Sequence, residues 1–334
     1  MTQQVDLASL YRLRQADLLP AARFLKAAGL LRDDAFWTRQ GHRALLGLGL
    51  VHILAGIICF FAFNWADMPS FAKFAVIATG IVLCALSSWR VGIHRPAGEA
   101  LLIGASVLAG VLLAVIGQVY QTGADAFQLF AAWGLVILPW VLVSRSAAHW
   151  AMWGLIYYLA WSFYLIQAWV FIHPSELTEI TVIGLAAIVP IAGLVMREAA
   201  TSAGIDWLNR SWTRVLPLLI AAGHLLLMGF EILLKDTGIP YLTVPTIGLL
   251  LAMAFYGWAR PSFPAFALAA ASIAGLIAAT GWRIFALGLE DALILGANPE
   301  VLLFVLMTLW CLGVAFGLQR LLQWARPHVE GHHP

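Results

Sequence analysis

The fold is decided by residues 98–120, which read GEALLIGASVLAGVLLAVIGQVY. After Glu99 this stretch has no charged residue, and its apolar positions form a run instead of alternating with polar ones. About 20 apolar residues are enough for a helix to cross the roughly 30 Å of hydrocarbon in a bilayer. The strands of a transmembrane β-barrel alternate apolar and polar positions, so they do not fit this pattern. The stretch therefore predicts a membrane-spanning helix.

The composition of the whole chain supports the same interpretation. Of its 334 residues, 62% are apolar and 11% are charged, whereas soluble domains are roughly 45–50% apolar and about 25% charged. The 15 Trp, 18 Phe and 7 Tyr residues exclude a disordered chain. We expect an all-α polytopic membrane protein.

Ten apolar stretches have the length of a membrane span. They are expected at residues 44–65, 71–89, 98–120, 126–144, 148–171, 179–196, 214–234, 241–259, 263–288 and 300–324. Residues 1–43 are polar with amphipathic spacing, which predicts a short helical head in the cytoplasm. We therefore divide the chain into this head, a transmembrane bundle over 44–326 and a cytoplasmic tail over 327–334.

The basic residues predict the orientation of the bundle. If the N-terminus is inside, 16 of the 19 Lys and Arg residues fall on the inner side, and only Lys73, Lys235 and Arg283 fall on the outer side. Short cytoplasmic loops carry an excess of Lys and Arg. The distribution therefore predicts that both termini are cytoplasmic, in a multi-pass protein of a bacterial inner membrane.

Two motifs carry a resemblance to a known family. Residues 63–69 read FNWADMP and are followed by Lys73, and residues 117–125 read GQVYQTGAD and are followed by Trp133 and Pro139. Over roughly residues 10–170 the chain resembles the bacterial predicted-membrane-protein family called domain of unknown function 2157. The resemblance implies a bacterial inner-membrane protein. It transfers no activity and no catalytic residue.

The first candidate site is a group of polar residues near the predicted outer ends of the first four spans. Its members flank two short turns and are Asn64, Asp67, Lys73, Gln118, Tyr120, Gln121 and Asp125. Because short loops place neighbouring spans side by side, we expect the two turns to approach each other. In one interpretation they form a small polar pocket that opens outward, with Lys73 holding an anionic group. In the other they are ordered turns in which Asp67 or Asp125 neutralises Lys73.

The second candidate site is an intramembrane charge network. Spacings of seven and four residues place His224, Glu231 and Lys235 on one helical face, and Arg283 lies at a comparable depth in the ninth span. Ionisable groups in hydrocarbon are costly and usually pair, so we expect Glu231 to pair with Arg283. One interpretation is a proton relay or a polar substrate site. The other is a contact that fixes the packing of the two spans.

Three functional classes remain open. The favoured class is a carrier or lipid-handling protein with an outward-opening polar cavity. The alternatives are a membrane-embedded enzyme acting at the outer leaflet and a non-catalytic assembly or sensing subunit. No motif identifies a catalytic residue, a metal site or a cofactor, and the basic residues are too dispersed for a nucleic-acid interface. The bilayer is the expected partner, and binding to a second copy or to a membrane or periplasmic protein stays open.

Overall fold

The computed structural model describes residues 18–30, 67–175, 178–235, 239–292 and 299–330, with a few single or paired positions between residues 10 and 52. The chain divides into two units, residues 1–73 and 74–334. In the first unit, the helix expected in the head is present as α2 (Ala21–Leu30). The Phe24 side chain of α2 is buried, and the Arg14 guanidinium lies 5.2 Å from its ring centroid. The expected span 44–65 lies almost entirely outside the described residues.

The described part of the chain contains nine helical segments that are long and apolar enough to cross a membrane, and it contains no strand. They match the other nine expected spans. The segments are α4 (Ser70–Val91), α5 (Pro96–Tyr120), α6 (Ala126–Ser144), α7 (Ala147–Tyr164) continued by η1 (Leu165–Trp169) and α8 (Val170–Ile172), α9 (Thr178–Ala186) with α10 (Ile188–Ser202), α11 (Ser211–Lys235), η3 (Ile239–Leu242) with α12 (Thr243–Ala254) and η4 (Phe255–Ala259), α13 (Phe263–Ala292), and α14 (Pro299–Glu330).

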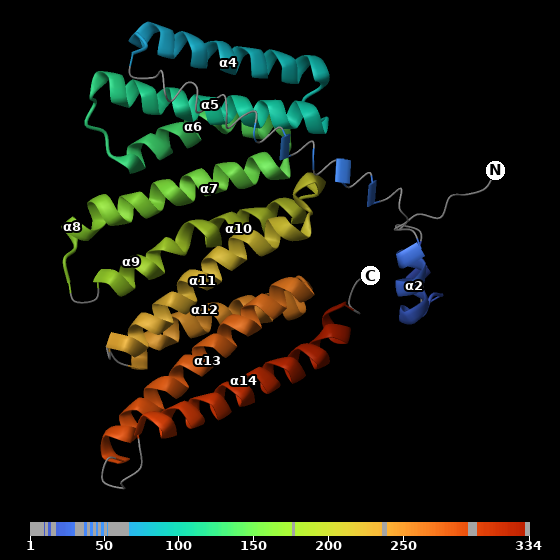
Figure 1. Ribbon diagram of the computed structural model, residues 1–334, viewed down its shortest axis with the longest axis vertical. Helices are drawn as coiled ribbons and strands as arrows, with labels where there is room; N and C mark the ends of the chain where they lie inside the picture. The colour runs from blue at the N-terminus through green and yellow to red at the C-terminus, as the bar shows by residue number, and fades with distance from the viewer. Residues whose placement is uncertain are drawn as a thin grey trace. The chain divides into compact units, whose positions relative to one another are not determined.

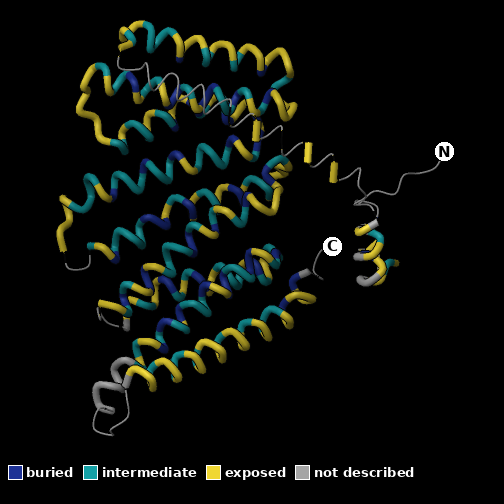
Figure 2. Tube along the Cα trace, viewed as in Figure 1, coloured by how far each residue is buried: buried dark blue, intermediate teal, exposed yellow. Residues whose placement is uncertain are grey.

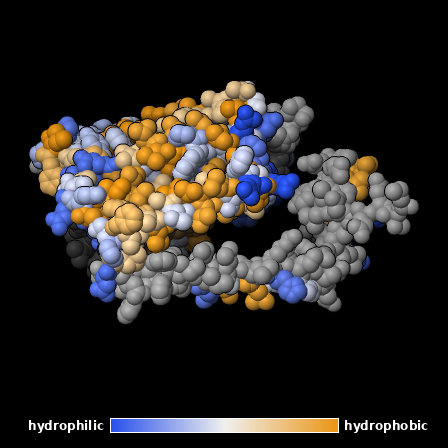
Figure 3. Space-filling view, turned by 90° about the horizontal axis from the view of Figure 1, so that it is seen from above, coloured by the Kyte–Doolittle hydropathy of each residue, from blue (hydrophilic) through white to orange (hydrophobic). Residues whose placement is uncertain are grey.

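The segments from α4 to α14 lie side by side, largely in chain order (Figure 1). Helix α11 is the most central, because it packs against α9, α10, α12 and α13. Buried residues are most frequent on α5, α11 and α13, whereas α4 and α14 expose most of their length (Figure 2). In Figure 3 apolar residues cover much of the visible face, and strongly polar residues gather towards its ends. An apolar outer surface of this kind is what a bilayer requires.

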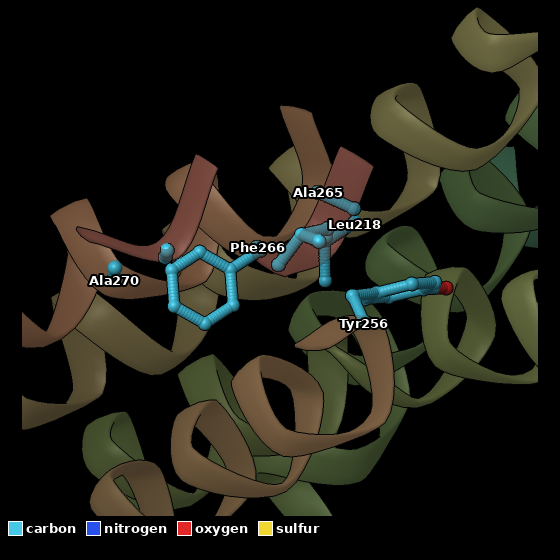
Figure 4. Close-up of a cluster of buried hydrophobic side chains, with 7 residues drawn as sticks. Leu218, Tyr256, Ala265, Phe266 and Ala270 are labelled. Carbon is cyan, nitrogen blue, oxygen red and sulfur yellow. The ribbon is translucent and has the colours of Figure 1, made fainter. Parts of the chain in front are cut away.

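Among the described residues, the largest buried apolar cluster joins the C-terminal helices. Leu218 of α11, Tyr256 of η4 and Ala265, Phe266 and Ala270 of α13 pack together (Figure 4). The small alanine side chains let α13 approach its neighbours closely, which is the usual means of packing helices in a membrane. The cluster fixes the position of Tyr256, whose hydroxyl contributes to the site described below.

Two tryptophans join neighbouring helices by the same kind of contact, a hydrogen bond from the indole to a backbone carbonyl one turn before a glycine. The Trp133 indole of α6 donates a 2.7 Å hydrogen bond to the α5 carbonyl four residues before Gly110, and a Cβ at Gly110 would lie 2.4 Å from that ring. The Trp310 indole of α14 donates at 2.9 Å to the α13 carbonyl four residues before Gly281, where a Cβ would lie 2.2 Å from the ring. Only glycine leaves room for the indole at these positions. We call them the tryptophan–glycine contacts.

Candidate functional site

Three charged side chains gather in the interior where α10 leads into α11. Arg197 and Glu198 lie on α10, and Arg214 lies in the first turn of α11. Glu198 Oε1 accepts hydrogen bonds from Arg197 Nη1 at 2.7 Å and from Arg214 Nε at 2.8 Å. The three side chains are 1%, 8% and 16% exposed, respectively. Pairing makes such burial tolerable, because an unpaired buried charge is strongly destabilising. We call these three residues the ion cluster.

Arg197 also holds the connection between α10 and α11, which includes the short helix η2 (Asp206–Leu208). Its Nε donates to Thr213 Oγ1 at 3.2 Å, and its Nη2 lies 3.4 Å from both Asn209 Oδ1 and the Arg210 carbonyl oxygen. With the bond from Nη1 to Glu198, every nitrogen of this guanidinium has an acceptor. Arg197 is therefore fully engaged within the protein.

Tyr256 of η4 also contacts the Glu198 carboxylate and the Arg214 guanidinium. Its hydroxyl donates to Glu198 Oε1 at 3.3 Å, and its ring lies 5.4 Å from the Arg214 guanidinium carbon. Glu198 thus accepts from Arg197, Arg214 and Tyr256 together. The ion cluster contains two positive charges and one negative charge, so it carries one positive charge in excess.

A cavity of about 300 Å³ lies beside the ion cluster, between α7, α10 and α11. Its lining is almost entirely apolar and includes Trp150, Gly154, Tyr158, Gly193, Trp212 and Thr213. Thr213 connects this cavity to the ion cluster, because it also accepts the bond from Arg197. We call the cavity the groove.

The predicted residue His224 lies close to the groove. Its Nδ1 is 2.8 Å from the Ile220 carbonyl oxygen, and its Nε2 is 3.2 Å from the Tyr158 hydroxyl. A carbonyl can only accept, so Nδ1 carries a proton. In the neutral ring Nε2 is then the acceptor, and Tyr158 donates to it. Both ring nitrogens of His224 and the Tyr158 hydroxyl therefore have partners within the protein.

Glu231 and Lys235 are brought together as the helical spacing predicts. Lys235 Nζ lies 3.5 Å from Glu231 Oε2, and it also contacts the Glu179 carboxylate of α9. This second contact was not foreseen, although Glu179 begins the neighbouring span. Arg283 lies on α13 as expected, and its pairing with Glu231 stays a prediction.

The first predicted turn lies partly outside the described residues, because Asn64 is not among them. Asp67 is exposed in the turn before α4, and Lys73 lies in the first turn of that helix. Both belong to the first unit. The expected approach of this turn to the second one stays a prediction.

In the second predicted turn, the helix ends three residues before Gly123. Gln118 and Tyr120 belong to the last turn of α5, Gln121 takes a left-handed conformation with φ 47°, and Asp125 precedes α6. The exposed ring of Tyr120 stacks on Phe74 at a centroid distance of 6.1 Å. Because the helix ends at Tyr120, Gln118, Gln121 and Asp125 do not share a continuous helical face.

A buried serine–histidine contact joins α5 to α7. Ser106 Oγ lies 2.9 Å from His149 Nε2, and Ser144 Oγ lies 3.1 Å from His149 Nδ1. Both serine hydroxyls also donate to backbone carbonyls one helical turn earlier. The Ser106 and His149 side chains are fully buried, so a substrate cannot reach this hydroxyl. We assign the contact to helix packing rather than to nucleophilic catalysis.

The ion cluster and the groove were not foreseen as a site. Arg197 and Arg214 entered the sequence argument only as basic residues of the inner side. A signal was present, since Arg197 and Glu198 end one apolar run and Arg214 begins the next. Periodicity could not reveal that α10, α11 and η4 bring these residues together around one carboxylate.

Comparison with known proteins supports the resemblance over part of the chain. Residues 2–150 match the model of the family described as predicted membrane protein (DUF2157). The matched region ends before the groove helices α10 and α11. No curated protein and no solved structure matches the chain.

Proposed function

We propose that this chain is a lipid-handling protein that takes a lipid from the surrounding bilayer and holds one hydrocarbon chain in the groove. The observation that carries the proposal is the apolar cavity of about 300 Å³ between α7, α10 and α11. This volume lies at the lower end of the range for small-molecule sites. A hydrocarbon chain that moves from the bilayer into such a site exchanges one apolar environment for another, so it leaves no polar group unpaired.

The chemistry of the walls favours a hydrocarbon over a polar solute. Leu155, Trp212 and Leu216 line the groove and are also exposed on the outer surface of their helices, which gives a lipid a lateral path. The polar atoms of Thr213 and Tyr158 at the groove already have hydrogen-bond partners within the protein. A polar solute would lose hydration on entering this largely apolar lining, which is unfavourable.

The proposal differs from the polar cavity expected at the outer turns. The groove adjoins the arginine-rich connection between α10 and α11, which the basic-residue distribution assigns to the cytoplasmic side. We therefore propose binding from the inner leaflet of a bacterial inner membrane.

A photoactivatable lipid tests the proposal. The purified full chain, in bilayer nanodiscs, is exposed to phosphatidylcholine with a diazirine in one acyl chain, and the labelled peptides are identified by mass spectrometry. We expect the peptides of the groove helices to be labelled several-fold more than those of α14, which exposes most of its length to lipid.

Two glycine substitutions make the test specific. A Cβ at Gly154 meets nothing within 4 Å, so Gly154→Leu fills the groove without forcing the backbone and should abolish its excess labelling. Gly313→Leu on α14 is the matched control, because a Cβ there also meets nothing within 4 Å. Groove labelling equal to that of α14, or unchanged by Gly154→Leu, would refute the proposal.

A further inference from the structure

We infer that the groove selects a lipid with an anionic phosphate head group, which binds Arg214 and Arg210 at the start of α11. The inference rests on the proposed function, because it assigns the head group of the lipid whose chain occupies the groove. It follows from the charge balance of the ion cluster and from the position of that cluster beside the groove.

The single negative charge of Glu198 cannot balance both guanidinium groups of the ion cluster. Glu198 accepts from both guanidinium groups and from the Tyr256 hydroxyl. The bonds of Arg214 use Nε and Nη2, and both go to Glu198. Among the described residues, Nη1 of Arg214 has no acceptor. The Arg214 side chain is 16% exposed, and its guanidinium keeps one nitrogen for a further acceptor, for which a phosphate oxygen is well suited.

The groups around the ion cluster preserve this positive excess. Arg210 precedes α11 with an exposed side chain and gives only its backbone carbonyl to the network. Arg260 follows η4 and donates to Ser202 Oγ. An acidic residue outside the cluster, Asp206, is exposed on η2. Residues 188–214 and Arg260 thus include four arginines and two carboxylates.

The groove ends beside the turn of α11 that carries these arginines, although none of them lines it. Thr213 lines the groove and lies between Arg210 and Arg214 in the chain, and Trp212 lines the groove beside it. On α10, Arg197 lies one turn beyond Gly193 of the groove wall, on the same helical face. A lipid chain in the groove would thus bring its head group to the start of α11. Basic pockets between membrane helices bind anionic head groups in this manner.

The test compares two lipids that differ only in the head group. Diazirine-labelled phosphatidylglycerol and phosphatidylcholine with identical chains are used separately at equal mole fraction, and the ratio of groove labelling is measured. We expect phosphatidylglycerol to be favoured, with each arginine contributing about fivefold to the ratio. Arg210→Gln and Arg214→Gln should each lower the ratio by about that factor, and the double variant should bring it near one.

Two controls separate the effect of these arginines on lipid preference from a general loss of positive charge and from misfolding. Arg90→Gln removes an exposed arginine near the end of α4 and should leave the ratio unchanged. Arg210→Gln retains the carbonyl bonded to Arg197, and Arg214→Gln leaves one guanidinium on one carboxylate, so both variants are expected to fold. Thermal unfolding of each variant verifies this.

The outcomes distinguish the inference from the proposed function. Equal labelling by both lipids that is still abolished by Gly154→Leu would overturn the head-group inference and leave the lipid groove standing. Absence of groove labelling by either lipid would overturn both. Excess inorganic phosphate should lower the preference more than chloride at the same ionic strength, because it competes for the same arginines. Equal effects of the two anions would indicate general screening and overturn the inference.

Discussion

Replacing Glu198 by glutamine should destabilise the protein strongly. The substitution retains the shape of the side chain but removes the charge that holds Arg197 and Arg214 at 2.7 and 2.8 Å. Two opposite charges about 4 Å apart near a protein surface attract by about 4 kcal/mol. Glu198→Gln loses two such attractions and leaves two guanidinium groups that repel each other. A neutral amide costs less to bury than a carboxylate, and this gain offsets part of the loss. Breaking a buried pair typically costs about 3–5 kcal/mol, and we expect a loss in that range.

The measurement is unfolding of the purified protein in detergent, followed by tryptophan fluorescence. Glu179→Gln is the matched control, because the Glu179 side chain is 72% exposed in its contact with Lys235. An exposed ion pair contributes about 0–1 kcal/mol. The double variant Glu198→Gln/Arg214→Gln should regain part of the loss, since one stranded charge is removed. If Glu198→Gln is no more harmful than Glu179→Gln, the ion cluster does not stabilise the fold and our charge argument is wrong.

Three further outcomes are expected. Gly110→Ala should lower stability by about 1–3 kcal/mol through overpacking against the indole 2.4 Å away, whereas Gly313→Ala should not lower it. In a double-mutant cycle, Glu231→Gln and Arg283→Gln together should be less harmful than the sum of the single effects, and strict additivity would show that they do not interact. In intact cells, an impermeant thiol reagent should label a cysteine in the α8–α9 connection and not one in the α10–α11 connection, and the reverse result would invert the predicted orientation.

The spans could be predicted because the hydropathy of a stretch depends only on the residues within it. The expected stretches 98–120 and 126–144 reappear as Pro96–Tyr120 and Ala126–Ser144, since each is a continuous apolar run closed by polar residues. The last helix runs to Glu330, beyond the expected boundary of the bundle at 326. Its final turns contain polar residues that a hydropathy criterion excludes, although helical hydrogen bonding continues through them.

The candidate site depends on contacts between distant residues and was less predictable. The spacing of Glu231 and Lys235 fixes their contact, because both lie on one helix. The hydrogen bond between Tyr158 and His224 joins α7 to α11, and that between Tyr256 and Glu198 joins η4 to α10. Each depends on how helices rotate and cross, and no local pattern encodes this. The groove likewise exists only where three helices meet.

The tryptophan–glycine contacts bear on how the bundle is assembled during synthesis. Each joins helices that are consecutive in the chain, α5 to α6 and α13 to α14. A helical hairpin of this kind needs no later segment to complete it, so we expect both pairs to close as they leave the translocon. Helix α11 differs, because it contacts α9, α10, α12 and α13 and cannot complete its packing until α13 has been made. The α5–α6 pair would then form early, whereas the full packing of α11 and the α13–α14 pair would follow only when the last segments have been made.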